Sequence, residues 1–204
     1  MARPRSFDET EVLARIRDTF WSTGYAATSI DEIAAAAGLG KGSLYGAFGT
    51  KEEMYRRVFA AYCAGLVDTV RARLAGSDSG ALDRVREQIR TIARATGADT
   101  ALRGCLLAKG AAERSEHDTQ VAEIARRTVQ AIGTLLTQAL SAAQRAGDIS
   151  ADADPARLGA FLLSVMRGIE ALGKAGTDPA YLDTAAETAL GLLPLTRQAT
   201  TTPT

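Results

Sequence analysis

Residues 28–52 contain two short helical patterns separated by a tight turn, and a further helix begins directly after them. Ser29 and Glu32 have the spacing of a capping box, in which each side chain binds the other residue's backbone N–H, so the first helix starts at Ser29. Gly38 ends this helix, because glycine adopts the left-handed conformation of a helix terminus without a Cβ clash. A second helix follows over residues 40–48. The arrangement predicts a helix-turn-helix whose second helix is narrow enough to enter a DNA major groove.

Apolar residues recur at helical spacing along the rest of the chain, which predicts an all-α fold of about nine helices. Asp78 or Ser79 is the expected cap of one helix, and an Asp-Pro pair starts each of the last two, at residues 154–155 and 178–179. The ranges expected to be helical are 8–23, 29–37, 40–48, 50–74, 79–95, 102–114, 121–147, 155–172 and 179–193.

The composition excludes several classes of protein. The chain has 204 residues, 46% of them hydrophobic, and no net charge at pH 7, and this length is sufficient for one or two hydrophobic cores. Two cysteines are too few for a secreted disulfide scaffold, the first residues lack the apolar region of a signal peptide, and no run approaches the ~18 apolar residues of a membrane span. We therefore expect a cytoplasmic protein. Because bulk charge is zero, any contact with DNA depends on where the basic residues are placed.

No pattern in the sequence indicates catalysis or metal binding. His117 is the single histidine, and no Ser or Cys nucleophile motif accompanies it, so we expect a surface residue and no enzyme activity. Asp148, Asp152 and Asp154 lack the glycine and closing glutamate of a calcium loop. The glycine-rich residues 38–43 lack the spacing of a phosphate-binding loop, and no strand precedes them. We expect neither a metal nor another cofactor.

A set of residues in the first 52 positions resembles the DNA-binding domain of the TetR family of transcriptional regulators. The matching residues are Phe20, Gly24, Tyr25, Thr28, Ser29, Ile33, Ala34, Ala37, Gly38, Lys41, Gly42, Ser43, Leu44, Tyr45, Phe48, Lys51 and Glu52. The resemblance implies a three-helix DNA-binding domain (residues 1–50), a helical ligand-binding and dimerisation domain (51–195) and a tail (196–204). The helix that starts at residue 50 would link the two domains.

The resemblance and the placement of charge together imply contacts with double-stranded operator DNA. Lys51 lies in the first turn of a helix, where its charge adds to free N–H groups that suit a phosphate. Arg3 and Arg5 lie on an arm ahead of the first helix, which can follow a phosphate strand or enter the minor groove. Gly46 and Ala47 stand where the family has a bulkier pair, which bears on base preference. The expected DNA-contacting residues are Arg3, Arg5, Thr28, Ser29, Lys41, Gly42, Ser43, Tyr45 and Lys51.

The last two helices are adjacent, apolar and rich in small residues, which suits a four-helix interface across a two-fold axis. The alternative is that they complete the core of a single chain. We favour a homodimer, because one module reads too few base pairs for useful affinity, whereas two half-sites of a palindromic operator supply it. The expected interface residues are Leu158, Phe161, Leu162, Val165, Ile169, Leu182, Ala186 and Leu190.

The resemblance also implies a repressor that leaves its operator when a small-molecule effector binds among the middle helices. The apolar faces of those helices favour a largely hydrophobic ligand. Cys105, flanked by Arg103 and near a helix N-terminus, is either a thiol that senses electrophiles or oxidants or a small packing residue. A helical small-molecule carrier or enzyme that retains the fold is the alternative from another class. The expected effector-binding residues are Tyr62, Leu66, Cys105, Leu106, Lys109, Ile132 and Met166.

Overall fold

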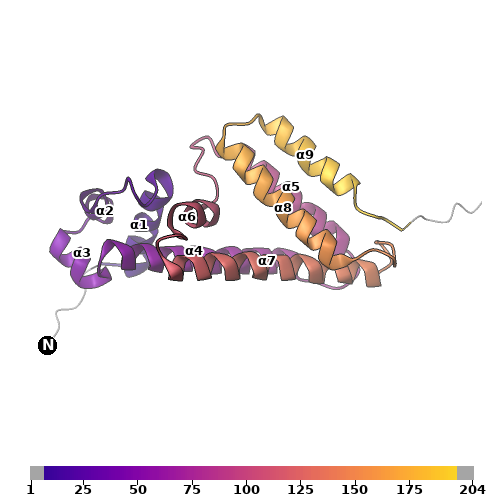
Figure 1. The fold of residues 1–204 in the computed structure, drawn as a ribbon, viewed down its shortest axis with the longest axis horizontal. Helices are drawn as coiled ribbons and strands as arrows, with labels where there is room; N and C mark the ends of the chain where they lie inside the picture. Colours follow the sequence, from indigo (N-terminus) through magenta and orange to yellow (C-terminus); the bar gives the residue numbers. More distant parts are fainter. Residues whose placement is uncertain (1–6, 197–204) are drawn as a thin grey trace, which may run out of the picture. The chain divides into compact units, whose positions relative to one another are not determined.

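The computed structural model describes residues 7–196, and within this part of the chain there are nine α-helices and no strand (Figure 1). The predicted all-α class is therefore confirmed. None of these helices combines the length and the hydropathy that a membrane crossing requires. The helices are α1 (Glu9–Thr23), α2 (Ile30–Ala37), α3 (Lys41–Phe48), α4 (Lys51–Leu74), α5 (Ala81–Gly97), α6 (Leu106–Arg114), α7 (Thr119–Arg145), α8 (Pro155–Lys174) and α9 (Pro179–Gly191).

The chain divides into two compact units. The first unit consists of residues 1–65 and 105–128, and the second unit of residues 66–104 and 129–204, with the terminal residues 1–6 and 197–204 outside the described part. Helices α4 and α7 each begin in the first unit and end in the second. Helix α6 thus belongs with the helix-turn-helix by its packing, although its residues fall in the range 51–195 that we expect to bind effector.

The first unit is built around buried side chains of α1 to α4. Phe20 and Ile33 are fully buried, and the aromatic rings of Phe20 and Tyr55 meet edge to face with centroids 5.1 Å apart. Both predicted caps of the helix-turn-helix are present, because Ser29 and Glu32 form the capping box of α2 and Gly38 ends that helix at φ +65°. These caps fix where α2 stops and therefore how α3 is presented.

The second unit has its core between α5, α8 and α9, which pack against one another, and the core also includes α7 residues such as Ile132 and Leu136. Figure 1 shows α5, α8 and α9 running alongside one another. Close approach is possible because small residues lie at the contacts: a Cβ on Gly97 would lie 2.9 Å from Pro179, and one on Gly159 would lie 2.6 Å from the hydroxyl of Thr137.

Two helix starts differ from the sequence-based expectation. Helix α5 begins after Gly80, at φ +77°, and no side chain caps it; Asp78, one of the two expected caps, instead binds Arg145. Helix α6 begins at Leu106 rather than at residue 102. The carboxylate of Asp99 accepts the N–H groups of Arg103 and Gly104 (2.8 and 3.1 Å), which holds this segment as a loop. The Asp-Pro starts of α8 and α9 are confirmed.

Candidate DNA-binding surface

Helix α3 presents a small, polar face to solvent. Leu44 and Phe48 point inward and are buried, whereas Lys41, Ser43 and Tyr45 are exposed, with 46% of Tyr45 accessible. The glycines of this face add no bulk, and a Cβ at Gly40, Gly42 or Gly46 would meet nothing within 4 Å. These glycines therefore do not serve packing in the described structure. They leave a thin helix whose backbone can approach base edges closely.

Lys41 is held by an acidic neighbour. Its Nζ lies 2.6 Å from Oδ1 of Asp31 on α2, and both side chains are largely exposed (56% and 75%). The hydrogen bond to Asp31 and its negative charge raise the pKa of Lys41, so the lysine is charged at neutral pH. The lysine that we expect to contact DNA thus has an ion-pair partner in the same surface, and DNA must compete with it.

The start of α2 offers backbone N–H groups to an anion, whereas the side chain of Thr28 just ahead of it is buried. Ser29 Oγ accepts only the N–H of Glu32 (3.1 Å), so the N–H groups of Ile30 and Asp31 have no acceptor among the described residues and suit a phosphate. The hydroxyl of Thr28, in contrast, is buried and donates to the carbonyl of Gly24 at 2.5 Å. Thr28 therefore fixes the turn ahead of α2. We expected its side chain to contact DNA, but it does not reach the DNA-facing surface.

Lys51 occupies the first position of α4, next to Tyr25. Thr50 and Glu53 form a second capping box (2.7 and 3.2 Å). The ammonium group of Lys51 lies 4.4 Å from the ring centroid of Tyr25. Burial and a 2.8 Å hydrogen bond to the carboxylate of Glu52 raise the pKa of Tyr25 to about 12. The neutral phenol thus gives Lys51 a fixed support at a helix N-terminus, where a phosphate is favoured.

Helix α6 holds the junction of α1 and α2 through contacts between residues that are far apart in the chain. Lys109 Nζ donates to the carbonyls of Trp21 and Ser22 at the end of α1 (3.0 and 3.3 Å). Glu113 accepts the backbone N–H of Tyr25 at 2.8 Å, and the guanidinium of Arg114 lies 4.0 Å from the Tyr25 ring centroid. The residues are about 90 positions apart in the chain, so no local pattern predicts these contacts.

Asp118 anchors the start of α7 in the same unit. Its Oδ1 accepts the N–H groups of Gln120 and Val121, and its Oδ2 accepts from Nε of Arg56 on α4 at 2.8 Å. Only 3% of the residue is exposed. Burial by itself would raise the pKa of this carboxyl, but the hydrogen bonds from Arg56 and from the backbone outweigh it, and the pKa is lowered. The helical ranges expected from the sequence leave this position between two helices.

The expected effector-binding residues lie in both units. In the first unit, Sγ of Cys105 is 3.7 Å from the hydroxyl of Tyr62, and Leu106 is buried. Lys109 is engaged with α1 as described above. In the second unit, Ile132 and Met166 are part of the buried core and Leu66 packs against it.

Gln88 on α5 is a candidate ligand contact that we did not single out from the sequence. Its residue is 1% exposed, and neither atom of its side-chain amide has a hydrogen-bond partner among residues 7–196. A buried amide is normally paired, so this one marks a place where a polar partner is missing. A glutamine inside an otherwise apolar helix face is the signal by which the sequence could have indicated it.

The expected interface residues fall into two groups. Leu162, Ile169, Leu182, Ala186 and Leu190 are buried in the core of the second unit within a single chain, which agrees with the alternative that we considered. Leu158 and Val165 are partly buried and Phe161 is 37% exposed. The large apolar side chains that are exposed on α8 and α9 are Phe161, Leu172 and Tyr181, and the exposed Leu192 follows α9.

Arg3 and Arg5 lie outside the described residues. Within residues 7–196, no three histidine, cysteine, aspartate or glutamate side chains are grouped so that they could hold a metal ion.

A helix-turn-helix with an exposed second helix and a lysine at the next helix start defines the chain as a DNA-binding protein by class. Residues 12–58 match the family described as "Bacterial regulatory proteins, tetR family", and residues 81–189 match "Tetracyclin repressor-like, C-terminal domain". The chain belongs to the TetR family of bacterial regulatory proteins, and it is a DNA-binding regulator of transcription. The family resemblance drawn from the motifs is confirmed.

Two relatives support this assignment along nearly the whole chain. The transcriptional repressor ComR of Escherichia coli strain K12 is 25% identical over 94% of this chain and 91% of its own length. Among solved structures, a cysteine mutant of the TetR family regulator CifR, complexed with 26bp double-strand operator DNA, is 29% identical with a TM-score of 0.81. The match covers 94% of this chain and 100% of the CifR chain.

Proposed function

We propose that the protein is a repressor that binds a palindromic double-stranded operator as a homodimer and is released by a small molecule. The observation that carries the proposal is the exposed face of α3, where Lys41, Ser43 and Tyr45 flank glycines that add no bulk. The names of the relatives agree, because ComR is called a repressor and CifR is bound to operator DNA. A repressor that binds the bacterial chromosome acts in the cytoplasm, so this localisation is part of the proposal.

On this proposal, α3 enters the major groove while the helix starts on either side bind phosphates. Lys41, Gly42, Ser43 and Tyr45 approach base edges or the adjacent backbone. The free N–H groups at the start of α2, near Ser29, and the charge of Lys51 at the start of α4 each suit one phosphate. The acidic Asp31 reduces nonspecific attraction to DNA, since a like charge near phosphate is unfavourable.

The homodimer is supported by two exposed apolar stripes in the second unit. On α8, Phe161, Val165, Gly168 and Leu172 follow one another at spacings of four, three and four residues, which places them on one face. No atom lies within 4 Å of a Cβ built on Gly168, so a partner helix can approach there. The same spacing relates Tyr181, Ala185 and Thr188 on α9 to Leu192 directly after it. Two such stripes suit a four-helix interface with a second copy.

An effector site in the second unit is supported by Gln88. Leaving a buried amide without partners costs roughly 1–3 kcal/mol, which a ligand that offers a donor and an acceptor would recover. The buried neighbours of Gln88 along α5, Val85 and Ile89, are apolar. The ligand that fits is therefore largely hydrophobic with one polar group. Because α4 belongs to both units, it is the element that we expect to carry the response to the helix-turn-helix.

Capture of genomic fragments by the purified protein, followed by sequencing of the retained DNA, tests the proposal. We expect one or a few palindromic sites, and the triple variant Lys41→Ala/Tyr45→Ala/Lys51→Ala should lose them while keeping its helical content. In Lys51→Ala alone, affinity should fall about equally for all sequences, and the salt dependence should weaken by about one ion per protomer. Unchanged retention by the triple variant would contradict the proposed DNA-binding surface, and a wild type that retains no specific sites would favour a small-molecule carrier with this fold.

A second mode of release is favoured by the position of Cys105. Cys105 is the N-cap of α6, the helix whose Lys109 and Glu113 hold the α1–α2 junction. It is 8% exposed, and its Sγ lies against the hydroxyl of Tyr62. Because the sulfur is nearly buried, we expect a group added to it to displace α6 or Tyr62, and a movement of α6 would disturb the junction. Electrophiles or peroxide would then release the operator without a reversible ligand.

Cys63 offers the matched control for this mode, because burial raises the pKa of its thiol to about 11 and makes it unreactive. Treatment with N-ethylmaleimide should abolish operator binding in the wild type and in Cys63→Ser, but not in Cys105→Ser. Mass mapping should find the adduct on Cys105. Full operator binding by protein that is modified at Cys105 would reject the thiol mode and leave the reversible ligand.

A further inference from the structure

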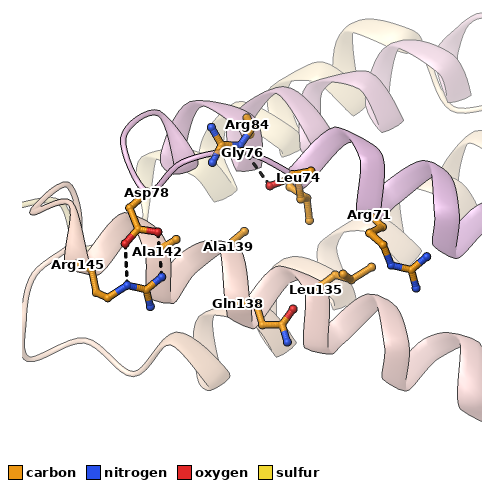
Figure 2. Close-up of a pocket in the computed structure, with 11 residues that line it drawn as sticks. Arg71, Leu74, Gly76, Asp78, Arg84, Leu135, Gln138, Ala139, Ala142 and Arg145 are labelled. Carbon is orange, nitrogen blue, oxygen red and sulfur yellow. Dashed lines mark hydrogen bonds and ion pairs between the residues drawn. The ribbon is translucent and has the colours of Figure 1, made fainter.

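A groove of about 260 Å³ lies in the second unit, between the end of α4, the loop to α5 and the last three turns of α7 (Figure 2). Leu135, Ala139 and Ala142 follow one face of α7 along it, and Leu74 lies opposite on α4. These side chains give the groove an apolar floor. None of the effector-binding residues expected from the sequence lines this groove.

One end of the groove carries a net positive charge. Arg145 and Asp78 form a bidentate pair, with Nε to Oδ2 at 2.7 Å and Nη2 to Oδ1 at 3.0 Å. This pair leaves Nη1 of Arg145 without a hydrogen-bond partner among the described residues, although a guanidinium has five N–H donors. Arg84 lines the same groove and also acts electrostatically on Asp78. Two guanidinium groups thus face one carboxylate.

Backbone carbonyl groups hold the side chain of Arg84 in this position. Its Nε donates to the carbonyl of Leu74 at 3.2 Å, and its other nitrogens donate to carbonyls of Ser77 and Ser79. Gly76 has φ +149°, and a Cβ there would lie 2.8 Å from the guanidinium carbon of Arg84. Carbonyl partners satisfy the donors of Arg84 but carry no full negative charge, so its positive charge contributes to the field of the groove.

The opposite end of the groove is electrically balanced. Arg71 lies there and pairs with Asp68, one turn earlier on the same helix. Gln138 contributes a neutral, exposed amide between the two ends. The groove therefore combines an apolar floor with a positive charge at the Arg145 end only.

We propose that this groove binds a small amphipathic monoanion, namely a carboxylate attached to a short apolar chain. The carboxylate binds Nη1 of Arg145, where a charge-assisted hydrogen bond is available. The apolar chain lies over Ala142, Ala139 and Leu74. The volume suits a ligand of this size rather than a larger cofactor. This binding site does not depend on the operator or on the effector site that Gln88 supports.

Titration with hexanoate, followed through the methyl NMR signals of Leu74, Leu135, Ala139 and Ala142, tests the proposal. We expect saturable shifts at these methyl groups with a dissociation constant on the order of 1 mM, given eight non-hydrogen atoms. Hexan-1-ol and hexylammonium should bind at least tenfold more weakly, because they lack the negative charge. Equal shifts with all three probes, or no shifts at these methyl groups, would overturn the proposal.

Two pairs of variants locate the site. Ala142→Leu fills the groove and should abolish the hexanoate shifts, whereas Ala72→Leu on the exposed face of α4 should leave them unchanged. Arg145→Gln should weaken hexanoate binding roughly tenfold, and Arg71→Gln, at the balanced end, less than twofold. If Arg145→Gln does not fold, the Ala142→Leu comparison still decides. Retained binding in Ala142→Leu would overturn the site.

Discussion

At the scale of single residues, the DNA-facing surface contains a charge that opposes binding. Asp31 holds Lys41 at 2.6 Å on a surface where DNA phosphates would otherwise be its partners. Exposed ion pairs of this kind contribute little to stability, because water and salt screen the two charges. The pair therefore influences DNA binding more than folding. It lowers affinity for any duplex and leaves discrimination to the contacts that α3 makes with bases.

Asp31→Asn is therefore predicted to strengthen DNA binding by about two- to fivefold, because it removes a negative charge near phosphate and frees Lys41. The gain should be equal for operator and random DNA in a fluorescence anisotropy titration. Asp83→Asn, which changes the net charge equally but lies in the second unit beside Arg86, is the control and should have no effect. Weaker binding by Asp31→Asn would show that the carboxylate positions Lys41 for DNA.

Gln88 lowers the stability of the fold, because its buried amide has no partner among the described residues. Replacing a buried amide that has no partner by an apolar group of similar shape is neutral or stabilising. We predict that Gln88→Leu raises the free energy of unfolding in urea by about 1 kcal/mol in the absence of ligand and weakens the response to an effector. A loss of more than about 1 kcal/mol would mean that the amide is paired in solution, for example by a water, and would remove it as a ligand contact.

At the scale of helices, the local caps of the helix-turn-helix were predictable and the long-range anchors were not. The Ser29–Glu32 and Thr50–Glu53 boxes follow from residues three apart, and both are present. The predicted start of α6 at residue 102 is wrong, because Asp99 accepts backbone N–H groups of the loop that precedes the helix. The Arg56–Asp118 pair joins α4 to the start of α7, 62 positions apart. Sequence periodicity carries no information about such pairing.

Asp118→Asn tests how much this anchor contributes. Asparagine caps a helix about as well as aspartate, so the substitution removes mainly the charge that Arg56 and Arg114 share. We predict a loss of about 2 kcal/mol in urea denaturation at pH 7, since a largely buried charge pair is broken. Asp154→Asn, the exposed cap of α8, is the control and should lose less than about 0.5 kcal/mol.

The stability difference between the wild type and Asp118→Asn should depend on pH, because the pKa of Asp118 is lowered in the folded protein. A carboxyl whose folded pKa lies below its unfolded value of about 3.9 stabilises the fold above that value and loses this contribution as pH falls through the folded pKa. The stability difference between wild type and Asp118→Asn should therefore be constant above about pH 5 and shrink below pH 4. A difference that does not change between pH 7 and pH 3 would contradict this origin.

At the scale of the whole molecule, the sequence predicted two apolar helices at the end of the chain but not which of their faces is free. Leu162 and Leu182 carry the same periodic signal as Phe161 and Tyr181, yet the first two are fully buried in the core of the second unit. Periodicity identifies an apolar face, whereas the direction of that face depends on packing against α5. The proposed interface is thereby narrowed to the exposed stripes of α8 and of residues 181–192.

The double variant Phe161→Glu/Tyr181→Glu is predicted to separate the homodimer. Both side chains are exposed in one chain, 37% and 60%, so the charges should not disturb folding, but in the dimer they would be buried without a partner, which is costly. Sedimentation should give a species of 21.4 kDa where the wild type gives twice that mass, and operator affinity should fall at least 100-fold because one module reads only a half-site.

Val129→Glu, at an apolar residue of α7 that is 38% exposed, is the matched control and should remain a dimer. A double variant that sediments like the wild type, or a wild type that is monomeric at micromolar concentration, would place the interface elsewhere and require another explanation for the exposed stripes.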